Sequence, residues 1–211
     1  MVVNFSPVST EAGLRETKKQ ETRQSISDHA TRLFITHGFE ATTIAEIADA
    51  ARVAKKTVTN YFPRKEDLAL DYHNEFAASL ATTVTARAPG ESALTALRRE
   101  FDRAATNYEA VAGFANPGFC RMITNSPTLI ARLRELHELR EQALAEALPG
   151  NELTRRAAAT QLGSAHRLLF QRVQELTLGG RSRRRTADTV RAEATYIFDL
   201  LEPALGDYAI A

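Results

Sequence analysis

Basic side chains are concentrated in one short stretch of the chain, residues 52–65. They are Arg52, Lys55, Lys56, Arg64 and Lys65, and no Asp or Glu interrupts them. Lys and Arg neutralise phosphate groups, and such contacts supply most of the sequence-independent affinity of a protein for DNA. The pattern is also compatible with a solvated basic turn, so its meaning depends on the elements that hold these side chains.

Two helices are predicted before this stretch. Apolar residues recur at helical spacing from Ile26 to Phe34, and Gly38 is expected to end that helix. Thr43 and Glu46 then form a capping box, in which each side chain accepts a hydrogen bond from the backbone amide of the other residue. A helix of about two turns is expected to follow Thr43.

The basic stretch itself contains a turn and a third helix. Residues 55–62 are predicted to be helical with Val58 and Phe62 on the buried side, and Pro63 ends the helix. Ala54 offers no capping side chain, and lysines at a helix N-terminus oppose the helix dipole, so a bound phosphate would relieve both problems. Two short helices joined by a tight turn form a helix-turn-helix, whose second helix can lie in the DNA major groove.

The rest of the chain also shows helical spacing, which predicts an all-α fold. A long fourth helix is expected to open at Glu66 and Asp67 and to close at Pro89. Further helices are expected at residues 91–112, 117–124, 127–148, 152–178 and 186–202, with Arg181–Arg185 as a solvated loop. We expect a flexible tail at residues 1–16, the helix-turn-helix domain at 17–64, a larger helical body at 65–211, and a loose end from residue 203.

Length, charge and cysteine content exclude several classes of protein. The chain has 211 residues with 27 Lys and Arg against 26 Asp and Glu, so any nucleic-acid surface must be local. The single cysteine cannot form an internal disulfide, which fits a reducing cytoplasm. The sequence shows neither a transmembrane run nor a signal peptide. It also lacks paired metal-binding histidines, a phosphate-binding glycine loop and a nucleophile elbow, so no enzyme activity, metal or cofactor is expected.

Residues 38–48 (GFEATTIAEIA) and 53–68 (VAKKTVTNYFPRKEDL) resemble the DNA-binding domain of the tetracycline-repressor (TetR) family of regulators. The resemblance covers about residues 20–70, and the remainder matches only in helix number and length. It implies an all-helical homodimer with a three-helix DNA-reading head, and an effector-binding and dimerisation body at residues 65–211. A twofold dimer is expected to bind a roughly palindromic operator.

The resemblance also assigns DNA-binding positions. Lys55, Lys56, Thr59 and Asn60 would face the groove, on the side of the helix opposite Val58 and Phe62. The residues that would contact phosphates are Thr43, Thr57, Tyr61 and Lys65. Two residues depart from the family pattern, because Thr59 replaces the usual Tyr and Arg52 takes a turn position where Gly is usual. A left-handed Arg52 would cost on the order of 1 kcal/mol, unless the turn differs, and its side chain is a further candidate for a phosphate contact.

For the body, we expect a ligand cavity between the middle helices and a dimer interface on the last two. Aromatic and sulfur residues are candidates to line the cavity, although they also suit plain core packing: Phe101, Tyr108, Phe114, Phe119, Met122, His166 and Phe170. Arg121 and Arg167 are possible anchors for an acidic effector. A stripe on residues 152–178 suits close packing, either with a second chain or with the chain's own core: Ala158, Leu162, Ala165, Leu169 and Val173. Cys120 is expected to be a buried small residue rather than a redox sensor.

These features predict a ligand-responsive transcriptional regulator, most simply a repressor that a small apolar or amphipathic effector releases from its operator. Two alternatives stay open at this point. One is a DNA-binding dimer without a small-molecule effector, which a thermal-shift screen separates from the first hypothesis. The other is an all-helical enzyme or carrier whose basic turn is incidental, which a band-shift assay with DNA upstream of the gene tests.

Overall fold

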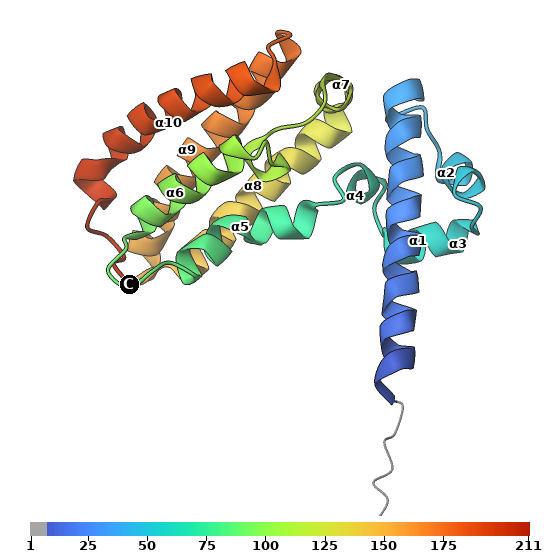
Figure 1. Cartoon of the computed structure of the whole chain (residues 1–211), viewed down its shortest axis with the longest axis horizontal. Helices are drawn as coiled ribbons and strands as arrows, with labels where there is room; N and C mark the ends of the chain where they lie inside the picture. Colours follow the sequence, from blue (N-terminus) through green and yellow to red (C-terminus); the bar gives the residue numbers. More distant parts are fainter. Residues whose placement is uncertain (1–7) are drawn as a thin grey trace, which may run out of the picture. The chain divides into compact units, whose positions relative to one another are not determined.

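The computed structural model describes residues 8–211, with side chains from residue 13 onward. Within this range the chain forms ten α-helices and one 3₁₀ helix and contains no strand, which confirms the all-α prediction (Figure 1). The chain divides into two compact units, Met1–Asp71 and Tyr72–Ala211, each of which has its own core. None of the described helices is long and apolar enough to cross a membrane.

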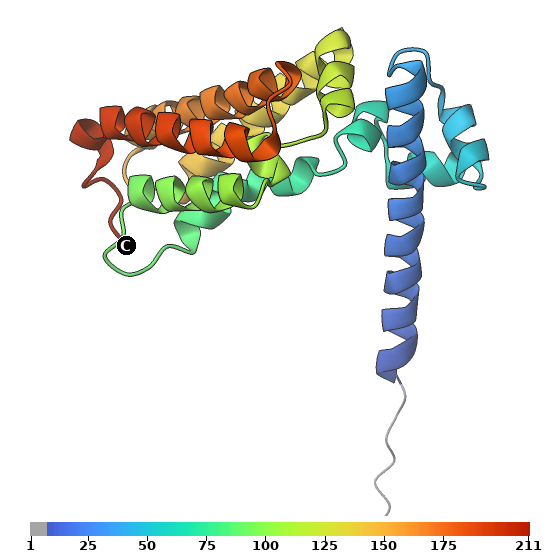
Figure 2. The same ribbon diagram turned by 45° about the horizontal axis from the view of Figure 1, so that its top comes forward.

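The first unit consists of one long helix and three short ones. They are α1 (Val8–His37), α2 (Ile44–Ala50), α3 (Lys55–Tyr61) and α4 (Lys65–Ala69). The short helices pack beside the later part of α1 (Figures 1 and 2). Their apolar faces meet in a core of fully buried side chains: Ile26, Phe34, Ile47, Val58, Phe62 and Leu68. The capping box at Thr43 and the helix end before Pro63 both lie where the sequence predicts them.

Two boundaries in this part of the chain differ from the prediction. Residues 8–16 belong to α1 rather than to a flexible tail, and residues 1–7 lie outside the described residues. The expected long fourth helix is interrupted after Ala69, and the division between the units falls at Asp71 rather than at residue 64. The apolar spacing runs through the break, but Leu68 is buried in the first unit and Phe76 in the second, while Tyr72 between them is 60% exposed. One periodic stripe therefore serves two separate cores.

The second unit is a bundle of helices. It contains α5 (His73–Thr85), α6 (Ala93–Thr106), the 3₁₀ helix η1 (Ala110–Ala112), α7 (Pro117–Asn125), α8 (Pro127–Ala147), α9 (Glu152–Leu178) and α10 (Arg183–Leu205). In the bundle α5 packs on α8, α8 on α9, and α10 on both α6 and α9. Most of these helices start at a Ser or Asn that accepts a hydrogen bond from a first-turn amide, as at Asn116, Ser126 and Asn151. Leu97, Leu162 and Phe198 are among the fully buried residues of this core.

Three further details of the second unit differ from the prediction. The helix expected to reach residue 112 ends at Thr106, because Tyr108 adopts a left-handed conformation with φ of 57°. The run Arg181–Arg185 is not all loop, since Ser182 caps α10 and the last three arginines form its exposed first turn. The end of the chain is anchored rather than loose: Gly90 and Ala211 pair through their backbones, and Arg87 Nε donates to Ala209 O at 3.0 Å.

Candidate nucleic-acid interface and ligand cavity

The turn between α2 and α3 is fixed by backbone hydrogen bonds. Val53 N donates to Ala48 O at 2.9 Å and Arg52 N donates to Asp49 O at 3.2 Å, which is the Schellman pattern of a helix end. This pattern requires a left-handed residue after the cap, and Arg52 takes that position with φ of 55°. The side chain of Arg52 is exposed and forms no hydrogen bond or ion pair with the described residues. The turn thus closes through a left-handed residue even though that residue is Arg and not Gly.

The recognition helix α3 has one buried and one exposed face. Val58 is completely buried, whereas Lys55, Lys56, Thr59 and Asn60 are exposed. The helix has no acidic residue in its first turn, and Ala54 provides no side-chain cap. The four expected groove-facing residues therefore form a continuous solvated surface whose charge is positive. A short cationic helix held away from its own core is the form in which a helix-turn-helix presents itself to DNA.

The residues expected to contact phosphates lie in different environments. Thr43 is exposed, but its hydroxyl already accepts from Glu46 N at 3.2 Å and donates to Glu46 Oε2 at 2.9 Å. The backbone amide of Thr43 also donates to Glu46 at 2.7 Å, and these bonds hold the pKa of the Glu46 carboxyl below its usual value. Thr57 and Tyr61 are half-buried beside the exposed face. Thr43 thus serves as the cap of α2 in the free chain.

Lys65 has a structural role that the sequence did not indicate. Its ammonium donates to Phe39 O at 2.6 Å and lies 4.4 Å from the centre of the Phe39 ring. Burial lowers the pKa of Lys65, and nearby Glu40 opposes that shift. The contact ties the start of α4 to the loop between α1 and α2. A phosphate contact by Lys65 stays a prediction, and it would compete with this anchoring.

A cavity of about 390 Å³ lies in the second unit, among α5, α6, η1, α8 and α9. Of the seven predicted lining residues, Phe101 and His166 border it. Tyr108, Phe114, Phe119, Met122 and Phe170 are not among its lining residues. Phe170 packs instead against Phe76 and His137, with ring centres 5.5 and 5.2 Å apart, and Phe114 packs against Tyr108 at 5.6 Å. Phe114 and Phe170 are buried and contribute to the core, whereas Tyr108 is 39% exposed.

Arg140, a buried residue of α8, also lines the cavity and was not among the predicted residues. Its position in the sequence nevertheless indicated that it would be buried. Arg140 lies four residues after Leu136 and four before Leu144, both of them buried, so it falls on the apolar stripe of its helix. By contrast Arg121 and Arg167 are exposed and do not line this cavity.

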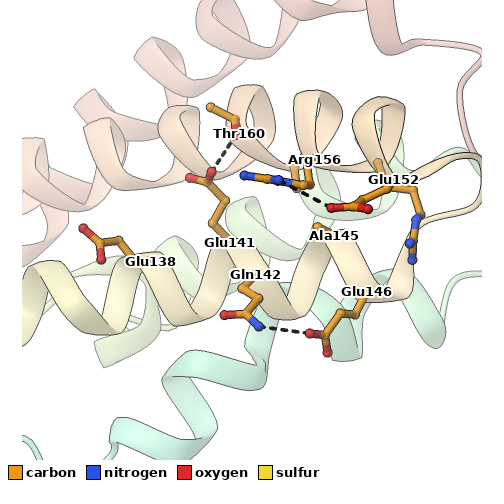
Figure 3. Close-up of a pocket in the computed structure, with 10 residues that line it drawn as sticks. Glu138, Glu141, Gln142, Ala145, Glu146, Glu152, Arg156 and Thr160 are labelled. Atoms are coloured by element: carbon orange, nitrogen blue, oxygen red, sulfur yellow. Dashed lines mark hydrogen bonds and ion pairs between the residues drawn. The ribbon is translucent and has the colours of Figure 1, made fainter.

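A second hollow is an open groove of about 530 Å³ between α8 and α9. Figure 3 shows that its polar side chains bond to one another: Thr160 donates to Glu141 at 2.6 Å, and Gln142 donates to Glu146 at 3.2 Å. Arg156 pairs with a carboxylate of its own helix. The groove is therefore an open polar surface, and several of its groups already bond to one another.

The stripe proposed for dimerisation faces the chain's own core. Its five members are all buried within the second unit: Ala158, Leu162, Ala165, Leu169 and Val173. Other apolar residues of α9 and α10 are exposed, namely Leu168, Tyr196 and Leu200. A shallow apolar hollow is bordered by Leu168, Tyr196 and Ile197. Cys120 is fully buried as predicted, and burial raises the pKa of its thiol.

Comparison with known proteins relates both units to bacterial regulators. Residues 26–72 match the family described as bacterial regulatory proteins, tetR family. The HTH-type transcriptional regulator TcmR of Streptomyces glaucescens is 30% identical over 146 residues, which are 66% of this chain. The chain covers 64% of that relative, somewhat less than two thirds of its length.

Solved structures share the fold over almost the whole chain. Two structures of NalD, described as the secondary repressor of the MexAB-OprM multidrug efflux pump in Pseudomonas aeruginosa, match with TM-scores of 0.54 and 0.56. They are 16% and 18% identical and cover 90% and 89% of this chain and 98% of each NalD chain. A TetR transcriptional regulator from Rhodococcus sp. RHA1 matches with a TM-score of 0.50 and 20% identity, covering 89% of this chain and 99% of that one.

Proposed function

From these matches we propose that the chain is a DNA-binding transcriptional regulator of the TetR family. The observation that carries the proposal is the exposed, acid-free face of α3, with Lys55, Lys56 and Asn60 directed away from the core. Lys56 and Asn60 are suited to read base edges, whereas Arg52 at the turn is suited to a phosphate. A regulator of this type acts in the cytoplasm, where bacterial DNA is found.

The proposed active form is a homodimer. The exposed apolar residues Leu168, Tyr196 and Leu200 of α9 and α10 support this assignment, because soluble monomers rarely leave such side chains grouped on one surface. A twofold dimer presents two copies of α3, so its operator is expected to be roughly palindromic, with half-sites about one helical turn apart or a multiple of it.

The proposed mode of control is release from the operator by a small-molecule effector. The cavity of the second unit supports it, because six residues of α5 line that cavity: Glu75, Ala78, Ser79, Leu80, Thr82 and Thr83. The chain enters α5 directly after Asp71, the last residue of the DNA-reading unit. A ligand that prefers one arrangement of α5 would change the DNA affinity, and a coupling of about 1–3 kcal/mol gives a 5- to 150-fold effect. The NalD proteins of similar fold are described as repressors, which favours repression.

A band-shift titration with the DNA upstream of the gene tests the proposal. The wild-type chain is expected to bind a palindromic segment there, and Lys56→Ala is expected to relax the preference among base substitutions in each half-site. Arg156→Ala is the matched control, because Arg156 is an exposed cation of α9 that pairs with Glu152. If wild type binds no segment, or if Lys56→Ala and Arg156→Ala have equal effects, the proposed interface is wrong. Retained DNA binding with no small molecule that raises the melting temperature would favour a regulator without an effector.

A further inference from the structure

The cavity of the second unit combines apolar walls with one buried cation, Arg140. Leu80, Leu97 and Phe101 provide apolar lining, while the guanidinium of Arg140 comes from α8. Arg140 is only 4% exposed, which is rare for an arginine unless it is paired with an acid. The volume of about 390 Å³ lies at the lower end of the range of small-molecule sites.

The protein holds Arg140 in place without neutralising it. Arg140 Nε donates to Ser79 Oγ at 2.8 Å, and Ser79 Oγ donates to Phe76 O at the same distance. The guanidinium carbon lies 4.6 Å from the centre of the Phe76 ring. The two Nη groups have no hydrogen-bond partner, and the guanidinium forms no ion pair, among the residues that the structure describes. Burial lowers the pKa of Arg140 to about 9, so the side chain remains a cation at neutral pH.

A second polar group in the cavity also has no partner. His166 of α9 is 4% exposed, and its Nε2 is buried without a hydrogen bond. The ring is held by edge contacts with Phe101 and Phe198, with ring centres 5.7 and 5.4 Å apart. Burial and then the charge of Arg140 hold the pKa of His166 well below its usual value, so the ring is neutral and Nε2 is available as one hydrogen-bonding group.

The carboxylates nearest to the cavity are engaged elsewhere or solvated. Glu100 lines the cavity, but it accepts two hydrogen bonds from Arg103, at 2.9 and 2.6 Å. Glu75 is an exposed residue of α5. The buried wall of the cavity therefore carries a net positive charge with unused donors, and a buried charge without a counter-ion is unfavourable.

We propose that the cavity binds a molecule with one anionic group, a carboxylate or an ionised phenol, on an apolar body. The anion would accept hydrogen bonds from the Nη groups of Arg140, and His166 would bond to a neighbouring polar atom of the ligand. This assignment rests on the proposed function, because it names the chemical class of the effector of that same cavity. It assigns the role of anchor for an acidic effector to Arg140, which is buried, instead of to Arg121 and Arg167, which are exposed.

Matched acids and amides test the charge requirement. The probes are 2-naphthoate with 2-naphthamide and decanoate with decanamide, titrated into the full chain by calorimetry. With wild type, at least one acid should bind about 10- to 100-fold more tightly than its amide, as expected for hydrogen bonds to a charged group. Arg140→Met should remove this preference, and Arg140→Lys should keep part of it. Arg167→Met, which removes an exposed cation of α9, should leave the preference unchanged.

A ligand-free measurement provides an independent check. Replacing an unpaired buried cation by an apolar side chain of similar length removes a desolvation cost, so Arg140→Met should melt at or above the wild-type temperature. The proposal is overturned if neither acid binds better than its amide, if Arg140→Met keeps the preference, or if Arg140→Met melts well below wild type. Failure of the proposed function is distinguishable, because it would appear as loss of operator binding by the wild-type chain without any ligand.

Discussion

Substitutions at Arg52 separate two effects that one side chain combines. The residue closes the turn between α2 and α3 with φ of 55°, a left-handed conformation that disfavours every residue with a Cβ atom. Its exposed guanidinium lies next to the recognition helix without a partner among the described residues. The backbone conformation should therefore lower stability, while the side chain should raise DNA affinity.

The expected stability change follows from the backbone angle. Arg52→Gly removes the cost of the left-handed conformation, which should stabilise the folded chain by about 1–2 kcal/mol. The greater freedom of Gly in the unfolded chain offsets about 0.4–1 kcal/mol of this gain. The net gain is about 1 kcal/mol, or roughly 2–4 °C in the melting temperature of a chain of this length. Arg52→Ala keeps the Cβ atom in the same conformation, so its stability should stay near wild type.

The expected change in DNA binding is the same for both variants, because both lack the guanidinium. Each Arg52 that neutralises a phosphate contributes about 0.9 to the slope of log affinity against log salt concentration, and this contribution should disappear. Urea unfolding and band shifts at several salt concentrations measure the two effects. If Arg52→Gly is no more stable than Arg52→Ala, the backbone argument is refuted. If both variants keep the wild-type slope of log affinity against log salt concentration, the phosphate contact is refuted.

The other predictions concern anchoring contacts and a buried ring. Lys65→Met should lower the free energy of unfolding, measured in urea, by about 1–3 kcal/mol, because it removes the hydrogen bond to Phe39 O. An unchanged free energy of unfolding would contradict the anchoring role. If the slope of log DNA affinity against log salt concentration also fell by about one, Lys65 would contact a phosphate as well. Burial lowers the pKa of His137 to about 3, so the unfolded chain takes up a proton below pH 6.5 while the folded chain does not. His137 should therefore contribute about 2 kcal/mol to the fall in the free energy of unfolding from pH 7 to pH 5, so a His137→Gln chain should lose correspondingly less. An equal fall in both chains would show that other groups, such as His166, are responsible. Arg23→Ala should cost about 1 kcal/mol by removing an ion pair with Asp71, and a double-mutant cycle that finds no coupling between the two residues would disprove it.

Features that depend on neighbouring residues could be predicted from the sequence. The capping box of Thr43 and Glu46 and the stop at Pro63 each arise from atoms a few residues apart. The exposed face of α3 followed from helical spacing once Val58 was placed in the core. The sequence also raised the question of Arg52, although only the structure shows that the turn keeps its left-handed form.

Features that depend on contacts between distant segments could not be predicted in this way. The bond between Arg140 and Ser79 joins residues 61 positions apart, so helical spacing can place Arg140 on the apolar stripe of α8 but cannot identify its partner. The break after Ala69 divides one apolar stripe between two cores, which periodicity alone cannot reveal. The apolar stripe around Leu162 suited packing against a second chain and against the chain's own core equally well, and in the structure it packs in the chain's own core.

The two proposed cationic sites of this chain would recognise anions by different physical means. Lys55 and Lys56 are solvated, so their affinity for phosphates comes largely from the release of counterions and falls steeply as salt is added. Arg140 is removed from water, where screening by salt is weak, so its affinity for an anion should depend little on salt. Added salt would therefore weaken the DNA complex while leaving the proposed effector complex nearly unchanged. In the proposed mode of control, effector and DNA favour different conformations of the same chain. Less effector should therefore be needed for release at higher salt.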